Sequence, residues 1–460
     1  MSARSRHLLF VTILVLSLAL SACAIRQDLR HEPSPFDAAS ISPAVDEPPH
    51  SAEFLFGAAR LDISPTESIP LGGYGVYFGS MKNTRLSRGT HDPLYATAFF
   101  LLKGKQALVL IETDLVGLFG GDIDPIRDAV AAKLKIDRNG VIVASTHTHH
   151  GPDTVGLWGT AIPANSGRSE AYMNKVKRTA VEAAWQAFQN RKPARVFYAL
   201  GEENELHYNI HEGQWPDRNL DGRITLLKFV GRDGATLGTL TNWACHPTTE
   251  DHPNQLASAD WVGRFYQRLE QAGGVPMFVN GSVGASVQPS IHWRDKNIGP
   301  EGSGQNFEWA TKFGDVLADK TMALLDDRMI EVKFDDIEIQ SRDIVVHAQN
   351  FIYRFAKVMG LLSMDYPLEG QGYPVQITAV KMGPLRLATL PGEMSPHLGL
   401  QIRQAVGGDA QVLIGLGNEW LGYILDREQY ADDGFAYEKM LCISPEFGED
   451  IVAAYRTIRF

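Results

Sequence analysis

Cysteine is nearly absent from this sequence, with three in 460 residues. So few cysteines exclude a scaffold that depends on disulfides. Blocks of lysine or arginine are also missing and the formal net charge is −11, which argues against nucleic acid as a partner. The apolar fraction of 44% and the charged fraction of 21% are typical of a globular protein, long enough for one large domain or two ordinary ones.

The apolar run at the N-terminus is too short to span a bilayer comfortably. Leu8–Leu20 follows the basic residues Arg4 and Arg6 and ends in Leu-Ser-Ala-Cys. The run fits a secretory signal, and its ending resembles a bacterial lipobox. We therefore expect residues 1–22 to be a lipoprotein signal peptide and Cys23 to be lipidated. The chain would then be exported and lipid-anchored to the bacterial cell envelope. The alternative is an ordinary signal peptide with a chance cysteine.

Composition changes near residue 50. Residues 24–50 are rich in proline, serine and charge and show no periodicity, so we expect 23–50 to form a flexible tether. Residues 51–460 are expected to form one folded domain without internal repeats. Its two cysteines, Cys245 and Cys442, are predicted to be buried free thiols.

Strand-like and helix-like segments alternate after the tether. A strand at Gln106–Thr113, a helix at Asp122–Leu134 and a strand at Val141–Thr146 form a βαβ pattern, which predicts a partly parallel sheet. Apolar residues recur every three or four positions in Ser169–Asn190, which predicts an amphipathic helix. The fold class is therefore α/β: a single large domain with mixed, partly parallel β-sheets flanked by helices. Further strands are predicted at Tyr95–Leu102, Ala194–Ala199, Arg223–Val230, Leu237–Trp243, Met277–Val279, Val375–Met382, Leu385–Leu390 and Gln411–Leu416, and further helices at Ala259–Ala272, Phe307–Leu325 and Ser395–Val406.

A histidine cluster follows one buried strand. The apolar run Val141–Ala144 leads into Thr146-His147-Thr148-His149-His150, and a Gly-Pro pair ends it. If strand geometry continues to this tip, His147 and His149 point to the same side. Imidazoles at the mouth of a strand are what a transition metal needs. Such a pair also arises by chance, so the interpretation requires partners from elsewhere in the chain.

Three further polar residues follow predicted strands. His246 comes after Leu237–Trp243, Glu393 after Leu385–Leu390, and Tyr423 after Gln411–Leu416. In an open α/β sheet, residues that follow strands converge on a crevice at one edge. Each residue also has a structural alternative. His246 could be a cap, Glu393 a carboxylate at the start of a helix, and Tyr423 a residue at the edge of the core.

These motifs resemble the neutral/alkaline, non-lysosomal ceramidase family, specifically its N-terminal catalytic domain. The resemblance rests on GAARLDISP at 57–65, THTHHGP at 146–152, NWACHPT at 242–248 and the Pro-Gly-Glu and Gly-Tyr pairs that contain Glu393 and Tyr423, and it runs from about Phe54 to the C-terminus. It implies a zinc amidohydrolase that releases a fatty acid from the amide of ceramide. Its substrate would be a lipid or another N-acyl amide. The membrane would be a second partner through the lipid anchor, and we expect no binding of nucleic acid.

Carried over by matching position, the resemblance implies four Zn²⁺ ligands: His147, His246, Glu393 and Tyr423. It implies a catalytic role for His149, beside the metal. Neutral imidazoles with one carboxylate suit Zn²⁺, and a weaker phenol leaves room for a water molecule. A nearby base such as His149 could carry a proton to the leaving amine.

The chain also departs from the family pattern. His150 replaces a serine, residues 284–289 lack an acidic residue that the family has, and Ile210 and His211 stand where it has an arginine. These departures motivate one alternative, a zinc esterase or amidase with a non-ceramide substrate. A further alternative, from another class, is a catalytically silent surface-binding lipoprotein. We expect His150 to be a solvated neighbour and Ser286 a turn residue; the sequence leaves the roles of Asp114 and Asp260 open.

Overall fold

The computed structural model describes residues 36, 44–74, 85–161, 164–211, 213, 220–299, 306–325, 329–351, 353–354 and 372–460. Residues 1–22 and Cys23, which carry the predicted signal peptide and lipidation site, lie outside these ranges. Within them, no helix combines the length and hydropathy that crossing a membrane requires.

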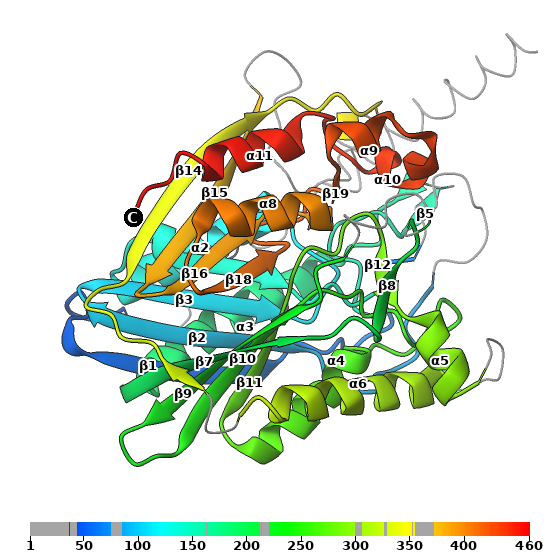
Figure 1. Cartoon of the computed structure of the whole chain (residues 1–460). Helices are drawn as coiled ribbons and strands as arrows, with labels where there is room; N and C mark the ends of the chain where they lie inside the picture. Colours follow the sequence, from blue (N-terminus) through cyan, green and yellow to red (C-terminus); the bar gives the residue numbers. More distant parts are fainter. Residues whose placement is uncertain are drawn as a thin grey trace, which may run out of the picture.

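The larger of two main sheets has nine strands, in the order β11-β10-β9-β7-β1-β2-β3-β4 with β13 paired to β7 (Figure 1). Most neighbours are antiparallel, but β3 pairs with β4, and β10 with β11, in parallel. The strands are β1 (Ser51–Asp62), β2 (Tyr95–Gly104), β3 (Gln106–Thr113), β4 (Val141–Ser145), β7 (Lys192–Glu202), β9 (Arg223–Gly231), β10 (Thr236–Trp243), β11 (Val275–Asn280) and β13 (Ile330–Glu331).

The smaller sheet has four strands in the order β14-β15-β16-β18. These are β14 (Glu338–Val346), β15 (Tyr373–Met382), β16 (Leu385–Leu390) and β18 (Ala410–Gly415). β16 and β18 pair in parallel through the crossover helix α8 (Pro396–Val406). Polar residues that follow β16 and β18 therefore emerge at the same end of this sheet.

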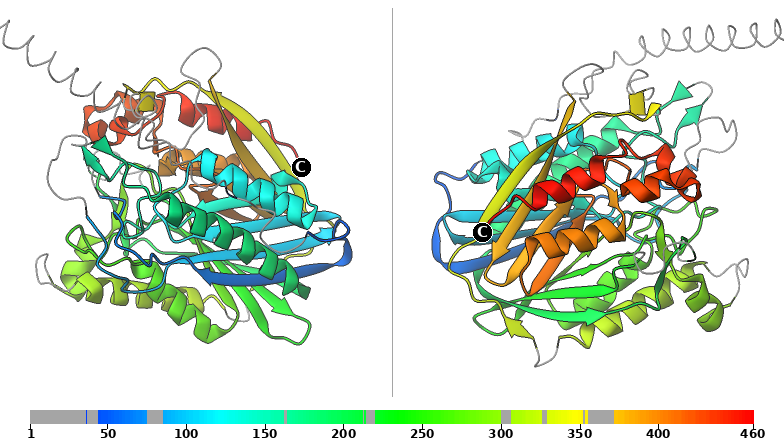
Figure 2. Two further views of the ribbon diagram at one scale, coloured as in Figure 1. Left: turned by 180° about the vertical axis from the view of Figure 1, so that it is seen from behind. Right: turned by 45° about the horizontal axis from the view of Figure 1, so that its top comes forward.

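The two sheets stack face to face, and helices cover both outer faces (Figure 2). Side chains alternate along the central strands: Phe99 and Leu101 pack toward the small sheet, whereas Ala98 and Phe100 pack toward the helices. This period of two is the pattern of a strand buried on both faces. Helices α2 (Gly120–Leu134), α3 (Glu170–Gln189), α4 (Trp261–Leu269) and α6 (Asn306–Met322) cover the large sheet, and α8 and α11 (Phe447–Tyr455) cover the small one.

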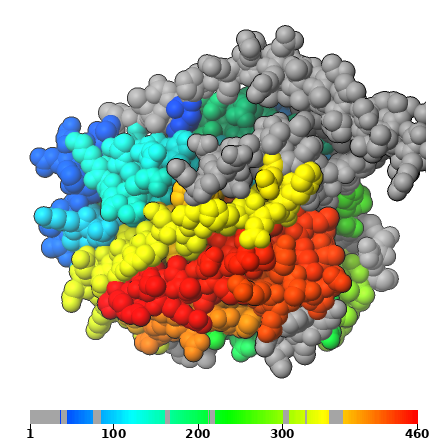
Figure 3. All heavy atoms as spheres, turned by 90° about the horizontal axis from the view of Figure 1, so that it is seen from above, coloured from blue at the N-terminus to red at the C-terminus, as the bar shows by residue number. Residues whose placement is uncertain are grey.

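The C-terminal segment forms much of the outer surface above the small sheet. Figure 3 shows α11 lying beside β14. Short elements complete the described fold: β5 (Thr160–Ala161), β6 (Ala164–Asn165), β8 (His207–Asn209), β12 (Val287–Pro289), β17 (Glu393–Met394), β19 (Tyr423–Ile424), α5 (Ile291–Asn297), α9 (Arg427–Ala431) and α10 (Ala436–Met440).

A buried asparagine joins the two sheets. Asn242 of β10 donates from Nδ2 to the carbonyl of Leu413 in β18 (2.8 Å), and its Oδ1 accepts from the Leu413 N–H (2.9 Å). The side-chain amide thereby pairs with a backbone peptide as another strand would. Because Asn242 is fully buried, losing either bond would leave a desolvated polar group. This contact fixes the ends of β10 and β18 relative to each other.

The predicted fold class is confirmed. The βαβ unit β3–α2–β4 has parallel strands, and Cys245 and Cys442 are buried free thiols. Among the long strands, two lacked a prediction: β1, because its apolar residues merge with the tether, and β14, because its outer residues are polar and charged. The strands of two or three residues were not predicted either. The expectation that one sheet supplies the crevice was wrong, since the four polar residues follow strands of two different sheets.

Candidate metal centre

The strand geometry assumed for the histidine cluster ends early. β4 stops at Ser145, and His147 adopts a left-handed backbone conformation with φ of 71°. The shared direction of His147 and His149 was therefore derived from a wrong premise. The turn nevertheless brings the two imidazoles together, with 3.2 Å between their Nε2 atoms. Left-handed residues other than glycine are uncommon and often lie at functional sites.

Backbone carbonyls fix the tautomers of His147 and His246. Nδ1 of His147 lies 2.5 Å from the carbonyl oxygen of Val116, and Nδ1 of His246 lies 2.6 Å from that of Val287. A carbonyl oxygen only accepts, so both Nδ1 atoms donate. Each Nε2 therefore presents a bare lone pair to the interior of the site. This is the orientation that metal-binding histidines adopt in proteins.

Glu393 faces both of these lone pairs. Its Oε2 lies 3.3 Å from Nε2 of His147 and 3.2 Å from Nε2 of His246. Its Oε1 accepts from the indole N–H of Trp420 at 2.8 Å. With both imidazoles neutral, three electron-rich atoms face one another with no proton between them. Such an arrangement is repulsive until a cation occupies it, so the donor set fits a metal ion.

Burial favours the neutral form of two histidines in the cluster. It lowers the pKa of His246, and it lowers the pKa of His149 well below the usual histidine value. Burial alone would raise the pKa of Glu393, but the positive charge and N–H donation that His147 and His246 offer when protonated hold it well below the usual range, so Glu393 is the anionic member of the cluster. Two neutral nitrogens and one carboxylate are ligands that a transition metal accepts.

Two short strands bring Tyr423 to the same place. β17 pairs with β19 in parallel so that Glu393 is opposite Tyr423. Burial and the nearby Glu393 carboxylate raise the pKa of Tyr423 well above its usual value, while a hydrogen bond with Ser286 opposes this. Ser286 in turn donates to Oε1 of Glu438 at 2.8 Å. Ser286 thereby links Tyr423 to Glu438.

Asn280, at the end of β11, holds both histidine-bearing loops. Its Nδ2 donates to the carbonyl of Thr146 (2.9 Å) and to that of Cys245 (3.0 Å), the residues preceding His147 and His246. Its Oδ1 accepts from the Cys245 N–H (3.1 Å). Asn280 is fully buried. A single side chain therefore sets the separation of the two loops.

His149 belongs to the same cluster. A nitrogen of His149 lies within 4.8 Å of nitrogens of His147 and His246, and its own Nδ1 is buried without a hydrogen-bond partner. Gly73 packs against it so closely that a Cβ there would lie 2.4 Å from the Cβ of His149. Arg85 donates to the carbonyl of His149. The backbone of His149 is thus held firmly while one ring nitrogen stays unused.

The expectation for His150 was wrong: it is fully buried rather than solvated. Its Nδ1 contacts Nδ2 of Asn254 (3.1 Å) and Nη1 of Arg85 (3.3 Å), and its Nε2 lies 3.5 Å from Oδ2 of Asp260. His150, Glu250 and Asp260 form a second group of ligand-type atoms within 4.8 Å of one another. Asp260 also caps α4 by accepting from the Trp261 N–H.

Asp114 does not touch the histidines. Its carboxylate accepts from the Tyr95 N–H (2.9 Å) and the Tyr266 hydroxyl (3.3 Å), and burial raises its pKa to about 7.

The segments that depart from the family pattern lie beside the centre. Residues 284–289 supply the carbonyl of Val287 to His246, a backbone group that survives side-chain changes. His211 binds Oε1 of Glu438 at 2.8 Å.

The structure brings together His147, His149, His246, Glu393 and Tyr423. Two of them follow β4, one follows β10, and Glu393 and Tyr423 lie in the short strands β17 and β19 that follow β16 and β18. Sequence reasoning missed Asn280 and Trp420, which position these residues. A signal was available for Asn280, since it follows a buried strand as His246 does. No sequence pattern indicated that the Trp420 indole reaches Glu393.

A mixed α/β fold with a buried histidine–carboxylate centre is the class of protein that these observations define. No family model matches the chain. The chain is similar to neutral ceramidase of Pseudomonas aeruginosa, with 25% identity over 260 residues, covering 52% of this chain and 37% of that protein. It is also similar to neutral ceramidase of Oryza sativa subsp. japonica, with 22% identity over 246 residues, covering 49% of this chain and 30% of that protein.

Solved structures agree. The crystal structure of neutral ceramidase from Pseudomonas aeruginosa superimposes with a TM-score of 0.74 at 20% identity, covering 88% of this chain and 74% of that chain. A structure described as ceramidase complexed with C2 gives 0.72 at 20% identity, with the same coverage. The resemblance to the neutral ceramidase family is therefore confirmed, and the chain has the fold of that enzyme. In the sequence matches, the chain spans less than half the length of these relatives.

Proposed function

We propose that this protein is a zinc-dependent amidohydrolase that hydrolyses an N-acyl amide bond, with a ceramide-like lipid as substrate. The observation that carries the proposal is the convergence of Nε2 of His147, Nε2 of His246 and Oε2 of Glu393 with their lone pairs inward. The similarity to proteins named neutral ceramidase supports the choice of bond and substrate class.

His147, His246, Glu393 and Tyr423 would hold the ion. Two imidazoles, a carboxylate and a phenol match the preference of Zn²⁺ for nitrogen and oxygen donors in a site that keeps an open position. When bound, zinc supplies a Lewis acid that polarises an amide carbonyl and makes water a nucleophile near neutral pH.

The residues around the ion would keep the donors in place. The carbonyls of Val116 and Val287 retain the protons on Nδ1 of His147 and His246, and the indole of Trp420 orients Glu393. His149 would exchange a proton with the leaving amine. Its unpartnered Nδ1 and its neutral state at physiological pH suit that exchange.

The second candidate keeps the metal and changes the substrate to an ester or a non-ceramide amide. It is favoured by His211 and Glu438, a hydrogen-bonded pair next to Ser286 where the family has an arginine. An imidazole paired with a carboxylate presents a different charge to a head group than a guanidinium does. The silent lipoprotein is the third candidate, and the converging lone pairs argue against it.

Zinc content and turnover of the same preparations test these alternatives. We expect about one zinc per chain in the wild type by elemental analysis, none in His246→Ala, and a retained ion in His149→Asn. Both variants should lose hydrolysis of an N-acylsphingosine, assayed in parallel with a matched acyl ester. Ester turnover alone would select the second candidate. Wild-type protein that takes up no zinc when zinc is supplied would exclude both enzymes.

We also propose export and lipid anchoring through Cys23. The leader composition and the lipobox-like ending support this. Radiolabelled palmitate should be incorporated into the wild type and not into Cys23→Ser, and an unlabelled wild type would contradict the anchor.

A further inference from the structure

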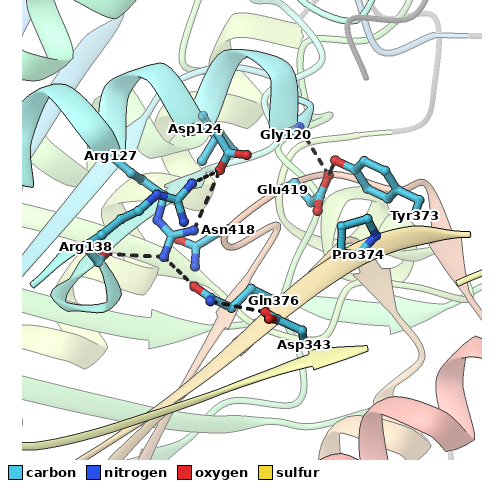
Figure 4. A pocket seen from close by; sticks show the side chains of 11 residues that line it. Gly120, Asp124, Arg127, Arg138, Asp343, Tyr373, Pro374, Gln376, Asn418 and Glu419 are labelled. Carbon is cyan, nitrogen blue, oxygen red and sulfur yellow. Dashed lines mark hydrogen bonds and ion pairs between the residues drawn. The ribbon is translucent and has the colours of Figure 1, made fainter. Parts of the chain in front are cut away.

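A second pocket lies away from the histidine cluster, between α2, β15 and the loop that follows β18 (Figure 4). Its volume is about 240 Å³, enough for a small metabolite of a few heavy atoms. α2 contributes four positions spaced by three or four residues, which form one face of the helix. The pocket is lined by Gly120, Ile123, Asp124, Arg127, Arg138, Asp343, Tyr373, Pro374, Gln376, Asn418 and Glu419.

Arg127 is a buried cation without a close carboxylate. Only 2% of it is exposed, and its guanidinium donates to uncharged oxygens: the Val141 carbonyl through Nε (2.9 Å) and the Gln376 side chain through Nη2 (2.6 Å). Asp124 lies 3.8 Å from Nη1 and is engaged more closely by Arg138. A desolvated guanidinium without a close counter-ion is costly, and a carboxylate in the pocket would compensate it.

Asn418 offers an unused donor at the same wall. Its Oδ1 accepts from the Val143 N–H at 3.0 Å, whereas its Nδ2 is buried without a partner. Asn418 is 4% exposed. Together with the Nε bond of Arg127 to Val141, the Val143 bond caps the open edge of β4, so a structural role explains those two atoms. It does not explain Nδ2, since buried donors are nearly always paired.

The opposite part of the pocket is acidic. Asp343 from β14 and Glu419 line it, whereas Asp124 lies on the basic side, 3.8 Å from Arg127 and in contact with Arg138. Glu419 accepts from the Tyr373 hydroxyl (2.8 Å) and the Gly120 N–H (3.1 Å), and burial raises its pKa to about 7. A simple anion would meet these carboxyl groups, and a simple cation would meet Arg127. A molecule with both charges suits both walls.

We propose that this pocket binds a small zwitterion of amino-acid size, with its carboxylate on Arg127 and Asn418 and its ammonium group toward Asp343. The site is distinct from the metal centre. One segment connects the pocket and the metal centre. Asn418 and Glu419 line the pocket, Trp420 donates a hydrogen bond to Glu393, and Tyr423 lies opposite Glu393.

Calorimetric titration of the full chain with L-alanine, acetate and ethylamine tests the recognition of both charged groups of the proposed ligand. L-alanine should bind saturably, and each half-molecule should bind more weakly. Asn418→Asp keeps an acceptor for the Val143 N–H and replaces the donor by an acceptor, so alanine affinity should fall at least about tenfold. Asp343→Asn, at an exposed position, should weaken alanine binding and leave acetate binding unchanged.

Two controls separate this pocket from the metal centre and from a general effect of added charge. Asn190→Asp makes the same chemical change at an exposed amide directly after α3 and should bind alanine like the wild type. His246→Ala should also retain binding, because amino acids chelate metals and a loss there would place alanine at the metal centre. Any of three results would overturn the proposal. They are a loss of alanine binding in His246→Ala, an alanine affinity of Asn418→Asp equal to that of the wild type, and the absence of saturable binding in the wild type. Binding of acetate as tightly as L-alanine would overturn the zwitterion in favour of a simple carboxylate.

Discussion

Two groups of histidines and carboxylates lie next to each other in this protein and differ in where their hydrogen atoms point. In the first, the donors of His147 and His246 are directed outward to backbone carbonyls, and lone pairs face Glu393. In the second, around His150, donors point inward. Asn254 donates to Oε2 of Glu250 at 2.8 Å.

The second group includes a protonated carboxyl group. The hydroxyl of Ser258 contacts both Oδ1 of Asp92 and Oε1 of Glu250. One hydroxyl hydrogen serves only one of them, so one carboxyl group must be protonated. Burial, together with Asp260 and Asp92, raises the pKa of Glu250 well above its usual value, which identifies Glu250 as that group. The direction of donors, rather than the list of residue types, therefore distinguishes a metal centre from a buried hydrogen-bond network.

Matched carboxylate-to-amide changes in the two groups should have opposite outcomes. Glu393→Gln removes the anionic ligand and should lower zinc affinity by more than the roughly 10–100-fold that outer groups contribute. Glu250→Gln reproduces the protonated carboxyl and should leave zinc affinity unchanged. Chelator competition measures both. Equal losses in the two variants would mean that the groups act as one site.

Asn280→Ala should weaken the centre without removing a ligand. Both histidine-bearing loops lose their common anchor, so we expect about a 10–100-fold loss of zinc affinity. Circular dichroism should show an intact fold. Asn242→Ala, which breaks a contact between the two sheets, should lower the free energy of unfolding but have a smaller effect on zinc affinity than Asn280→Ala. A larger loss of zinc affinity in Asn242→Ala than in Asn280→Ala would contradict the role assigned to Asn280.

Trp420→Phe should have a smaller effect on the same centre. The ring still packs, but Oε1 of Glu393 loses its donor, and a hydrogen bond to a charged group is worth enough to change zinc affinity about tenfold. Chelator competition again provides the measurement. Unchanged affinity would show that Glu393 is oriented by its backbone pairing with Tyr423 alone.

The second group should appear in the pH dependence of stability rather than in metal binding. Glu250 has a raised pKa in the folded protein, so the native state holds a proton that the unfolded chain releases above its pKa of 4.5. The free energy of unfolding should therefore fall as pH rises above that value. Urea unfolding measured at pH 5 and pH 9 gives the decline in the free energy of unfolding between the two values. We expect this decline to be smaller in Glu250→Gln than in the wild type, by on the order of 1 kcal/mol or more. Parallel curves for the two proteins would falsify the protonated carboxyl.

Sequence reasoning found the strands because their apolar patterns are local. β3 and β16 have the predicted bounds, and the amphipathic helix α3 differs by one residue at each end. Which strand belongs to which sheet was not predicted, since it depends on contacts such as Asn242 with Leu413 that no local pattern contains.

The candidate ligands were found because each follows a strand and matches a motif. Their geometry was not, because it arises from a left-handed residue at His147 and from the two-residue pairing of β17 with β19. The prediction of a solvated His150 was wrong for a similar reason. A polar residue beside Gly-Pro favours a surface turn, and only the packing of Asp260, Asn254 and Arg85 buries it.

The split origin of the ligands has a consequence for biogenesis. The two histidines follow strands of the large sheet, and Glu393, which lies 147 positions after His246, follows a strand of the small one. Domains form from the N-terminus as synthesis proceeds, so a growing chain displays its imidazoles long before it contains the carboxylate and the phenol that complete the set. Under the proposed function, metal capture is then a late step of maturation, and we expect a chain truncated before residue 424 not to achieve it.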